Sequence, residues 1–234
     1  MAINAGPKIE IDDLDFVLDA ANPRSYPRNG SNWKGLKRRN NFTLTNSPSF
    51  NDVNGGFFTF DGTDDYVVLG DLSSQLSNVT QYSIGCWFYQ NTLDVNAGIL
   101  GRPSSAATPS INTTTGGRMG FSVHNNRRTK GQIVDYSTVI SAGKWAHVFM
   151  VYNGSLTGNS ERLKVFIDAE QITLSYVNTI PSSTGAVTQT DFVLGKQHSD
   201  LHLNGGISNF KIYKRALSQR RIRANYQATV GRFT

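Results

Sequence analysis

Residues Gly205–Tyr226 have the sequence GGISNFKIYKRALSQRRIRANY, which changes from a strand pattern to a helix pattern. Its first half carries an imperfect alternation of apolar residues, namely Ile207, Phe210 and Ile212. Such alternation is typical of a strand buried on one face. Ser218 is a good N-cap residue, and Ile222 and Tyr226 lie four residues apart, on one face of a helix. The stretch predicts a late strand followed by one short C-terminal helix, so the rest of the chain must supply the sheets that this strand completes.

Short apolar runs precede this stretch along the whole chain. We expect strands at Lys8–Ala20, Gly56–Phe60, Tyr66–Leu69, Tyr82–Tyr89, Gly98–Gly101, Met119–His124, Ile133–Tyr136, Trp145–Tyr152, Leu163–Ile167, Phe192–Gly195 and Gly205–Tyr213. In Tyr82–Tyr89 both alternating rows are largely apolar, so this strand should be covered on both faces. Between Arg102 and Arg118 the composition predicts a long mobile loop. Short strands without intervening helical patterns predict an all-β, two-sheet antiparallel sandwich.

Size and composition agree with a single sandwich. The chain has 234 residues, of which 38% are hydrophobic, enough to bury one sizeable core. Its 22 glycines and its aromatic share of 11% favour strands joined by turns over a helical bundle. We therefore expect an N-terminal arm at residues 1–7 and one domain at residues 8–234, with Tyr26 and Trp33 pinning the loop at Asn22–Asn41 onto the sandwich edge.

Net charge and cysteine content indicate which binding partners to expect and in which cellular compartment the chain folds. The net charge of +6 is modest, and only 17% of residues are charged, so we expect no nucleic-acid partner. The single cysteine, Cys86, excludes an internal disulfide and should be an inert buried thiol. The N-terminus lacks a basic region followed by an apolar run, and no apolar stretch is long enough to span a bilayer. We expect no signal peptide, no membrane contact and folding in a reducing cytoplasm.

Five motifs, taken in order, carry a family resemblance. They are FDGTDDYVVLG (Phe60–Gly70), YSIGCWFY (Tyr82–Tyr89), KWAHVFMVYNGS (Lys144–Ser155), LKVFIDA (Leu163–Ala169) and GGISNFKIYKRALS (Gly205–Ser218). Together they resemble the laminin-G-like, concanavalin A-like jelly-roll domains, a superfamily that includes the pentraxins. The opening GPKIEIDDLDFVLDAANPRSYP is similar to laminin-G-like proteins of tailed bacteriophages. The resemblance implies a jelly roll that holds glycans or other proteins and rarely catalyses, although fold does not fix function.

Many relatives bind calcium through loop carboxylates. In pentraxins, acidic residues follow the strand that matches Phe192–Gly195. Here that place holds a lysine, Gln197, His198, a serine and Asp200, so a pentraxin-type calcium site is not expected and neither is any cofactor. Asp64 and Asp65 are weak candidates for a cation pair, and the alternative reading is a solvated turn, because calcium needs about 6–8 oxygen ligands.

Catalysis is not expected. Retaining glycosidases need two carboxyl groups about 5 Å apart. Only Glu10 and Asp12 faintly fit, since alternate residues of a strand share a face, but they lie at the start of the chain. We interpret His147 as a satisfied structural histidine rather than a ligand.

Two sets of residues are candidates for binding. Gln197, His198, Asp200, His202 and Asn204 could bind a glycan from one exposed segment, Lys196–Asn204, whose alternative role is a polar surface connection. Arg220, Arg221 and Arg223 stand near the N-terminus of the last helix, where positive charge costs a few tenths of a kcal/mol per residue. One hypothesis places an acidic surface of a partner subunit opposite them, and the alternative is a solvated helix face.

The leading hypothesis is a non-enzymatic virion surface protein of a tailed phage, attached to capsid or tail and made in the cytoplasm of the host bacterium. The N-terminal arm and the basic patches at Lys34–Arg39, Arg127–Lys130 and the last helix would dock it to capsid or tail proteins. Its outward loops would meet cell-surface polysaccharide, and it could form a homo-oligomer. The alternatives are a free carbohydrate-binding module or lectin and, third, a glycoside hydrolase.

Overall fold

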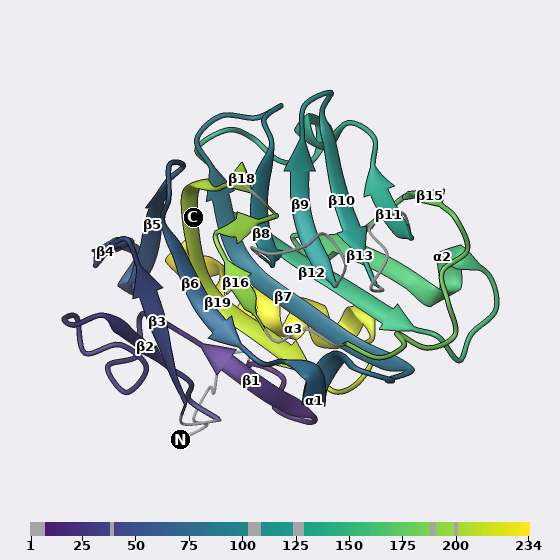
Figure 1. The fold of residues 1–234 in the computed structure, drawn as a ribbon, viewed down its shortest axis with the longest axis horizontal. Helices are drawn as coiled ribbons and strands as arrows, with labels where there is room; N and C mark the ends of the chain where they lie inside the picture. The colour runs from purple at the N-terminus through teal and green to yellow at the C-terminus, as the bar shows by residue number, and fades with distance from the viewer. Residues whose placement is uncertain (1–7, 38–39, 103–108, 124–128, 188–190, 199–200) are drawn as a thin grey trace, which may run out of the picture.

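The protein consists of two antiparallel sheets packed face to face, with a helix covering the outer face of one of them (Figure 1). This computed structural model describes residues 8–37, 40–102, 109–123, 129–187, 191–198 and 201–234. The all-β, two-sheet antiparallel expectation is confirmed. The predicted N-terminal arm, residues 1–7, lies outside the described residues.

The first sheet has eight strands. Its order is β14 (Glu170–Ile172), β13 (Leu163–Ile167), β12 (Ala146–Asn153), β7 (Gln81–Gln90), β19 (Asn204–Tyr213), β5 (Phe57–Asp61) and β4 (Ser49–Asn51), with β1 (Leu14–Leu18) beside β19.

The second sheet has nine strands. Its order is β15 (Ser175–Val177), β11 (Lys130–Ile133), β10 (Arg118–Ser122), β9 (Ser110–Thr114), β8 (Ala97–Gly101), β16 (Phe192–Leu194), β6 (Tyr66–Gly70), β3 (Asn41–Thr45) and β2 (Asn32–Lys34). A small hairpin joins β17 (Lys196–Gln197) to β18 (Leu201–His202). The helical elements are α1 (Ser73–Leu76), α2 (Asn159–Arg162), α3 (Gln219–Thr229) and the 3-10 turns η1 (Val53–Gly55), η2 (Tyr136–Thr138) and η3 (Val230–Arg232).

Strand β19 organises the eight-stranded sheet. It pairs with β7 along one edge, and its other edge is shared by β5, where Gly205 meets Phe60, and by β1, where Phe210 meets Leu18. The register shifts after Ser208, next to a positive φ of 54° at Asn209. Such a bulge bends a strand and increases its twist, which lets one strand serve two partners in succession.

The core lies between the sheets, and β7 is covered on both faces as predicted. Cys86 and its alternating neighbours face the core, whereas Trp87 points the other way, toward α3. Burial raises the pKa of the Cys86 thiol to about 12, so the thiol is protonated and inert as expected. Tyr26 and Trp33 pack on Phe58 with ring centroids 4.8 Å away in each case, which confirms that they pin their loop to the core.

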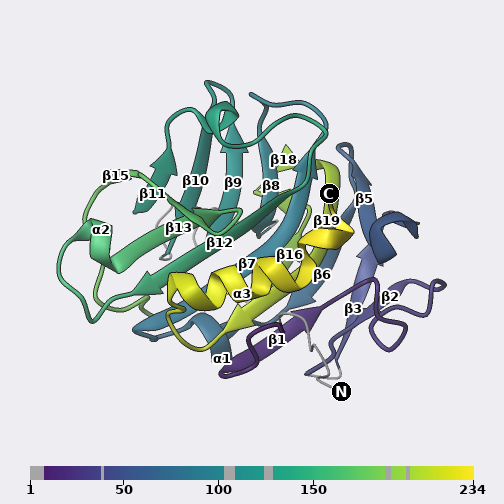
Figure 2. The ribbon, with the colours of Figure 1, turned by 180° about the vertical axis from the view of Figure 1, so that it is seen from behind.

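Helix α3 lies on the outer face of the eight-stranded sheet, behind the sheets in Figure 1 and in front of them in Figure 2. Ile222 is fully buried in a cluster with Phe149 and Phe166, and Tyr226 stacks on Trp87 with ring centroids 5.6 Å apart. Ser218 occupies the N-cap position as predicted, although its side chain makes no capping hydrogen bond. Among the described helices, none combines the length and apolarity needed to cross a membrane.

His147 lies beneath α3 between aromatic rings. Its centroid is 5.0 Å from Trp87, 5.0 Å from Phe149 and 5.7 Å from Tyr226. The structural role is as expected, but the histidine is not satisfied, because within the described residues neither ring nitrogen has a hydrogen-bond partner. Burial, together with the charge of Lys211, holds the pKa of His147 well below its usual value of 6.5.

Two strand predictions were wrong. The predicted mobile loop between Arg102 and Arg118 contains β9, which pairs with β8 and β10. Strand β11 ends at Ile133 instead of beginning there. The chain turns after Ile133 because the Asp135 side chain accepts a hydrogen bond from the Ser137 amide and caps η2.

Candidate functional site

A polar groove of about 450 Å³ runs over the outer face of the nine-stranded sheet. It is lined by Asn112, Thr114, Arg118, Ser122, Lys130, Gln132, Val177, Gln197, His198 and Leu201. Strand alternation explains this composition: Ile111, Met119 and Ile133 enter the core, and the residues between them face outward. The strands β9, β10 and β11 therefore form a rigid floor.

Gly120 is a buried residue beneath the groove. It lies opposite Asn112 on one neighbouring strand and Gln132 on the other. A β-carbon on residue 120 would lie 3.2 Å from the Asn112 side-chain oxygen. The Lys130 Cδ atom would lie 3.7 Å from the same β-carbon, so glycine here leaves room for the Asn112 and Lys130 side chains that line the groove.

The β17–β18 hairpin forms one wall of the groove, supplying Gln197, His198 and Leu201. It is pressed onto β8, where a β-carbon on Gly98 would lie 2.1 Å from the Gln197 backbone nitrogen. The Gln197 amide also donates to the hydroxyl of Ser110 on β9, at 3.3 Å. The wall is thus fixed to the sheet by close backbone contact and by a side-chain hydrogen bond.

The two amides of the floor have unused hydrogen-bonding capacity. Asn112 and Gln132 are each only 8% exposed. Within the described part of the chain, the Gln132 side chain makes no hydrogen bond, and the Asn112 side chain makes only a weak donation of 3.4 Å to the Thr113 carbonyl. Neither amide is among the described buried groups that lack a partner, so both still reach solvent and can bind a polar ligand in the groove.

Basic residues border the amides. Arg118 is exposed, and Lys130 and His198 are half-buried. No aspartate or glutamate is among the described residues that line the groove.

The predicted glycan-binding residues divide between different places. Gln197 and His198 meet in the groove, while the His202 ring lies against Tyr66, with centroids 6.4 Å apart, and Asn204 accepts a hydrogen bond of 2.7 Å from the Asn91 amide. Asp200 lies outside the described residues. The expectation of one exposed segment was wrong, because Gln197 and His202 are both 7% exposed.

The residues of the groove floor, such as Asn112 and Gln132, were not predicted from the sequence. Their signal is a polar residue at every second position of β9 and β11, each flanked by inward-facing residues. It is weak because the strands are short and lie in stretches rich in serine, threonine and glycine.

The predicted pair Asp64 and Asp65 belongs to a group of three, in which carboxylate oxygens of Asp61, Asp64 and Asp65 lie within 4.8 Å of one another. Asp61 accepts hydrogen bonds from the Thr63 amide at 2.7 Å and the Asp64 amide at 3.3 Å. The Thr63 bond is the main cause of its lowered pKa. Burial raises the pKa of Asp65, which accepts from the Asp61 amide at 3.1 Å. These bonds are those of a turn, and the three carboxylates fall short of the about 6–8 oxygens that calcium takes.

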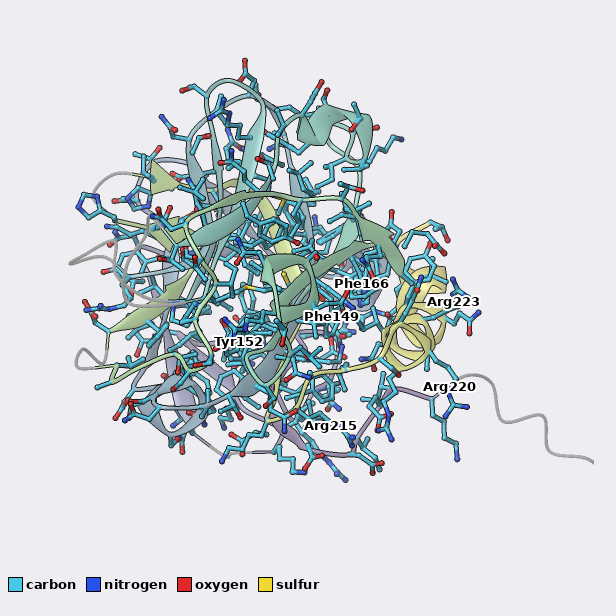
Figure 3. The ribbon with its side chains drawn as sticks, turned by 90° about the vertical axis from the view of Figure 1, so that its right-hand side faces the viewer. Phe149, Tyr152, Phe166, Arg215, Arg220 and Arg223 are labelled. Carbon is cyan, nitrogen blue, oxygen red and sulfur yellow. The ribbon has the colours of Figure 1, made fainter. Side chains whose placement is uncertain are left out.

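Two of the three arginines of α3 have acidic partners in the chain itself. Arg221 forms ion pairs with Glu10 at 2.7 Å and Asp12 at 3.3 Å, and Arg223 pairs with Glu170 at 2.8 Å. Their charges therefore do not require a partner subunit. Figure 3 shows Arg220 and Arg223 pointing away from the sandwich. Glu10 and Asp12, the carboxylates that faintly fitted a glycosidase pair, are thus held by α3, on the face opposite the groove.

A larger hollow of about 930 Å³ lies beside the N-terminal loop, lined by Asn22, Pro23, Arg24, Pro27, Lys34, Gly35, Leu36 and Asn41. Two prolines, a leucine and a glycine make up half of this lining. The Asn22 side chain is engaged in the loop itself, where it accepts from the Arg24 amide at 3.0 Å. In the sheet groove, by contrast, eight of the ten described lining residues are polar, so the groove is the better candidate site.

Comparison with known proteins places this geometry in context. Residues 61–223 match the family described as the concanavalin A-like lectin/glucanases superfamily. Among curated proteins, no sequence matches the chain significantly.

Solved structures with the same fold include two complexes with a sialic acid. A Trypanosoma rangeli sialidase in complex with sialic acid superposes with a TM-score of 0.66 at 14% identity, over 97% of this chain and 34% of the sialidase. The ligand binding domain of botulinum neurotoxin serotype D, in complex with N-acetylneuraminic acid, gives a TM-score of 0.67 at 14% identity, over 94% of this chain and 52% of that domain. This chain thus spans a third to a half of these proteins, and at such identity the likeness shows the fold.

Proposed function

Because this chain belongs to the concanavalin A-like lectin/glucanases superfamily, we propose that it is a non-catalytic glycan-binding module and that the sheet groove is its binding site. The groove itself carries the proposal. It combines a mostly polar lining with two amides, Asn112 and Gln132, that are each 8% exposed and lack good partners in the described residues. Amides in fixed positions bind the hydroxyl groups of a sugar because they can both donate and accept hydrogen bonds.

The positions of the described carboxylates favour a binding function over a hydrolytic one. Glycoside hydrolysis needs an acid and a second carboxylate on either side of the scissile bond. The described lining of the groove offers neither, and Glu10 and Asp12 are paired with Arg221 on the other face of the sandwich. The described lining can therefore hold a saccharide but offers no pair of carboxylates to cleave it.

We further infer a role on the surface of a tailed-phage virion, for which the resemblance of the segment at residues 6–27 to phage laminin-G-like proteins is the support. The positions of the two faces suit this role. Helix α3 and the segment around Glu10, whose amide donates to Asn225 at 2.8 Å, lie on the face opposite the groove. A particle bound at the α3 face would leave the groove open to bacterial polysaccharide. A free lectin is the second candidate, and the same groove supports it.

Two measurements separate these functions. The labelled full chain on an array of bacterial glycans should bind a subset, and a reducing-sugar assay on the bound glycans should show no release of ends above buffer. Binding to no glycan would contradict the binding function, and steady release of reducing ends would contradict the non-catalytic one. Mass spectrometry of purified virions should detect the chain, whereas its absence from virions would leave the free lectin as the function.

A further inference from the structure

The net charge of the chain is concentrated in one segment. Residues 20–51 contain six basic residues and no acidic residue; the basic ones are Arg24, Arg28, Lys34, Lys37, Arg38 and Arg39. The whole chain has 23 basic and 17 acidic residues, so subtracting these six leaves 17 of each sign outside the segment. The net charge of +6 therefore belongs to the N-terminal loop and the strands β2, β3 and β4 that this segment forms.

The hollow of about 930 Å³ beside the N-terminal loop, here called the basic hollow, belongs to this segment, since all of its described lining residues lie between positions 22 and 41. Arg24 and Lys34 line it and are exposed, and Lys37, also exposed, follows the lining residue Leu36. Arg28 lines a different hollow and is not part of this one. The basic hollow thus brings two cations, with a third beside them in the chain, to one concave surface.

These cations have no acidic partner in the described part of the chain. The side chains of Arg24, Lys34 and Lys37 make no ion pair and no hydrogen bond there. Asp19, the last acidic residue before the segment, is itself held by Arg232 at 3.2 Å. The three charges can therefore meet a carboxylate that a binding partner supplies.

Backbone hydrogen bonds fix the walls of the basic hollow. The Lys34 amide donates to the Ser25 carbonyl at 2.7 Å, and the Leu36 amide donates to the Val17 carbonyl of β1 at 3.0 Å. Leu36 also packs against the apolar cluster beneath α3. A surface that is already formed loses little conformational freedom on binding, so the contacts made there count toward affinity.

The rest of the lining favours a polypeptide as the occupant. Pro23, Pro27 and Leu36 present apolar surface beside the two cations. A polypeptide offers carboxylates and apolar side chains together, whereas a polysaccharide offers no apolar side chain. A lipid surface is flat, whereas this site is concave.

Nucleic acid suits the basic hollow less well. Single strands are held by stacking of their bases on aromatic side chains. No described lining residue of the hollow is aromatic, and Tyr26, Trp33 and Phe42 of the same segment are buried in the core.

We propose that the basic hollow binds an acidic segment of a partner protein, whose carboxylates meet Arg24, Lys34 and Lys37 and whose apolar side chain meets Leu36. Arg24 can hold a carboxylate through two parallel hydrogen bonds, whereas each lysine acts as a point charge. This interaction uses none of the residues of the sheet groove, so it does not depend on the proposed glycan binding. Through Leu36 the basic hollow adjoins the α3 face, and a partner bound there leaves the groove accessible.

The test uses matched peptides and the full chain. A fluorescent peptide of glutamates with one central leucine is compared, by fluorescence anisotropy, with the same peptide carrying glutamine in place of every glutamate. We expect the acidic peptide to bind at least about tenfold more tightly, with an affinity that falls as salt is raised. Arg24→Gln should weaken its binding about fivefold, and Arg24→Lys should restore part of it. Arg220→Gln, which removes an exposed charge outside the basic hollow, should leave the affinity unchanged.

Three results would overturn the inference. Equal affinity for the acidic and the glutamine peptide would show that the cations do not select carboxylates. Equal weakening by Arg24→Gln and Arg220→Gln would show attraction by overall charge. Tighter binding of single-stranded oligothymidylate, a sulfated oligosaccharide or vesicles of anionic lipid than of the acidic peptide would assign the hollow to another class of partner. Glycan binding should be the same in Arg24→Gln as in the wild type, so a failure of the glycan array would contradict the proposed function alone.

Discussion

Gly98 and Gln197 lie so close that a β-carbon on residue 98 would stand 2.1 Å from the Gln197 backbone nitrogen. This contact fastens the β17–β18 hairpin to the nine-stranded sheet and so makes one wall of the groove. Gly98 is part of strand β8, and its lack of a side chain also allows the hairpin to form this wall of the candidate site.

Gly98→Ala should both destabilise the protein and weaken glycan binding. The added methyl group would collide with backbone, which cannot rotate away, so the hairpin must move. We expect a loss of about 2 kcal/mol or more in the free energy of unfolding, measured by urea denaturation. Gly231→Ala is the control, because no atom lies within 4 Å of its β-carbon position. Equal stability of the two variants would refute the close contact.

The ion pair between Arg221 and Glu10 should stabilise the N-terminal segment. Their side chains are 26% and 14% exposed, so solvent screens the pair only in part. A double-mutant cycle with Arg221→Gln and Glu10→Gln should give a coupling energy of about 1 kcal/mol. The pair of Arg223 and Glu170, 49% and 69% exposed, should give less than about 0.5 kcal/mol. Coupling that is no larger for the first pair would contradict this account of α3.

His147 should make the protein less stable in acid. Its pKa in the folded state is held well below 6.5, whereas the unfolded chain takes up a proton near pH 6.5, so stability is lost as the pH falls below that value. The loss approaches about 1.4 kcal/mol per pH unit. His147→Phe should remove this contribution and be more stable relative to wild type at about pH 5 than at about pH 7.5. A stability difference that is the same at both pH values would show that His147 does not titrate on unfolding.

Lys211 should make the stability of the protein depend on pH in the alkaline range. Burial lowers its pKa from 10.5 to about 8, so below about pH 8 its charge is kept inside the protein at a cost. Between these values the unfolded chain holds the proton more tightly, and stability rises with pH. Lys211→Met should gain roughly 1–3 kcal/mol at about pH 7 and lose the rise above pH 8. The surface variant Lys164→Met is the control, and a destabilised Lys211→Met with the alkaline rise intact would contradict the prediction.

Strands with several large apolar residues could be predicted from the sequence, even the short strand β16, whereas strands poor in such residues could not. The alternation in β7, β12, β13 and β19 extends over five to ten residues, and each was predicted to within a residue at either end. Strand β9 has a single large apolar residue, Ile111, in a stretch rich in serine and threonine, so its composition indicated a loop. Its neighbours in the sheet supply the pairing that its own sequence does not indicate.

The candidate site was predicted in part. Gln197 and His198 were identified because polar residues cluster there, but Asn112 and Gln132 reach the same groove only through sheet pairing, which a single sequence does not reveal. The same holds for the arginines of α3: the Arg221 side chain meets Asp12, 209 positions away in the chain. The residues that were not predicted reach their places through strand pairing and long-range contacts, which local sequence patterns do not show.

A substitution at Gly120 tests the central claim most directly. Gly120→Val suits a strand, yet its β-carbon would lie 3.2 Å from the Asn112 side-chain oxygen and 3.7 Å from Lys130 Cδ, so the added methyl groups must displace these two lining side chains. Calorimetric titration with the tightest array glycan should show binding to the wild type and a loss of about a hundredfold or more in the variant, with both proteins folded by circular dichroism. Unchanged affinity in a folded Gly120→Val protein would contradict the assignment of the groove as the binding site.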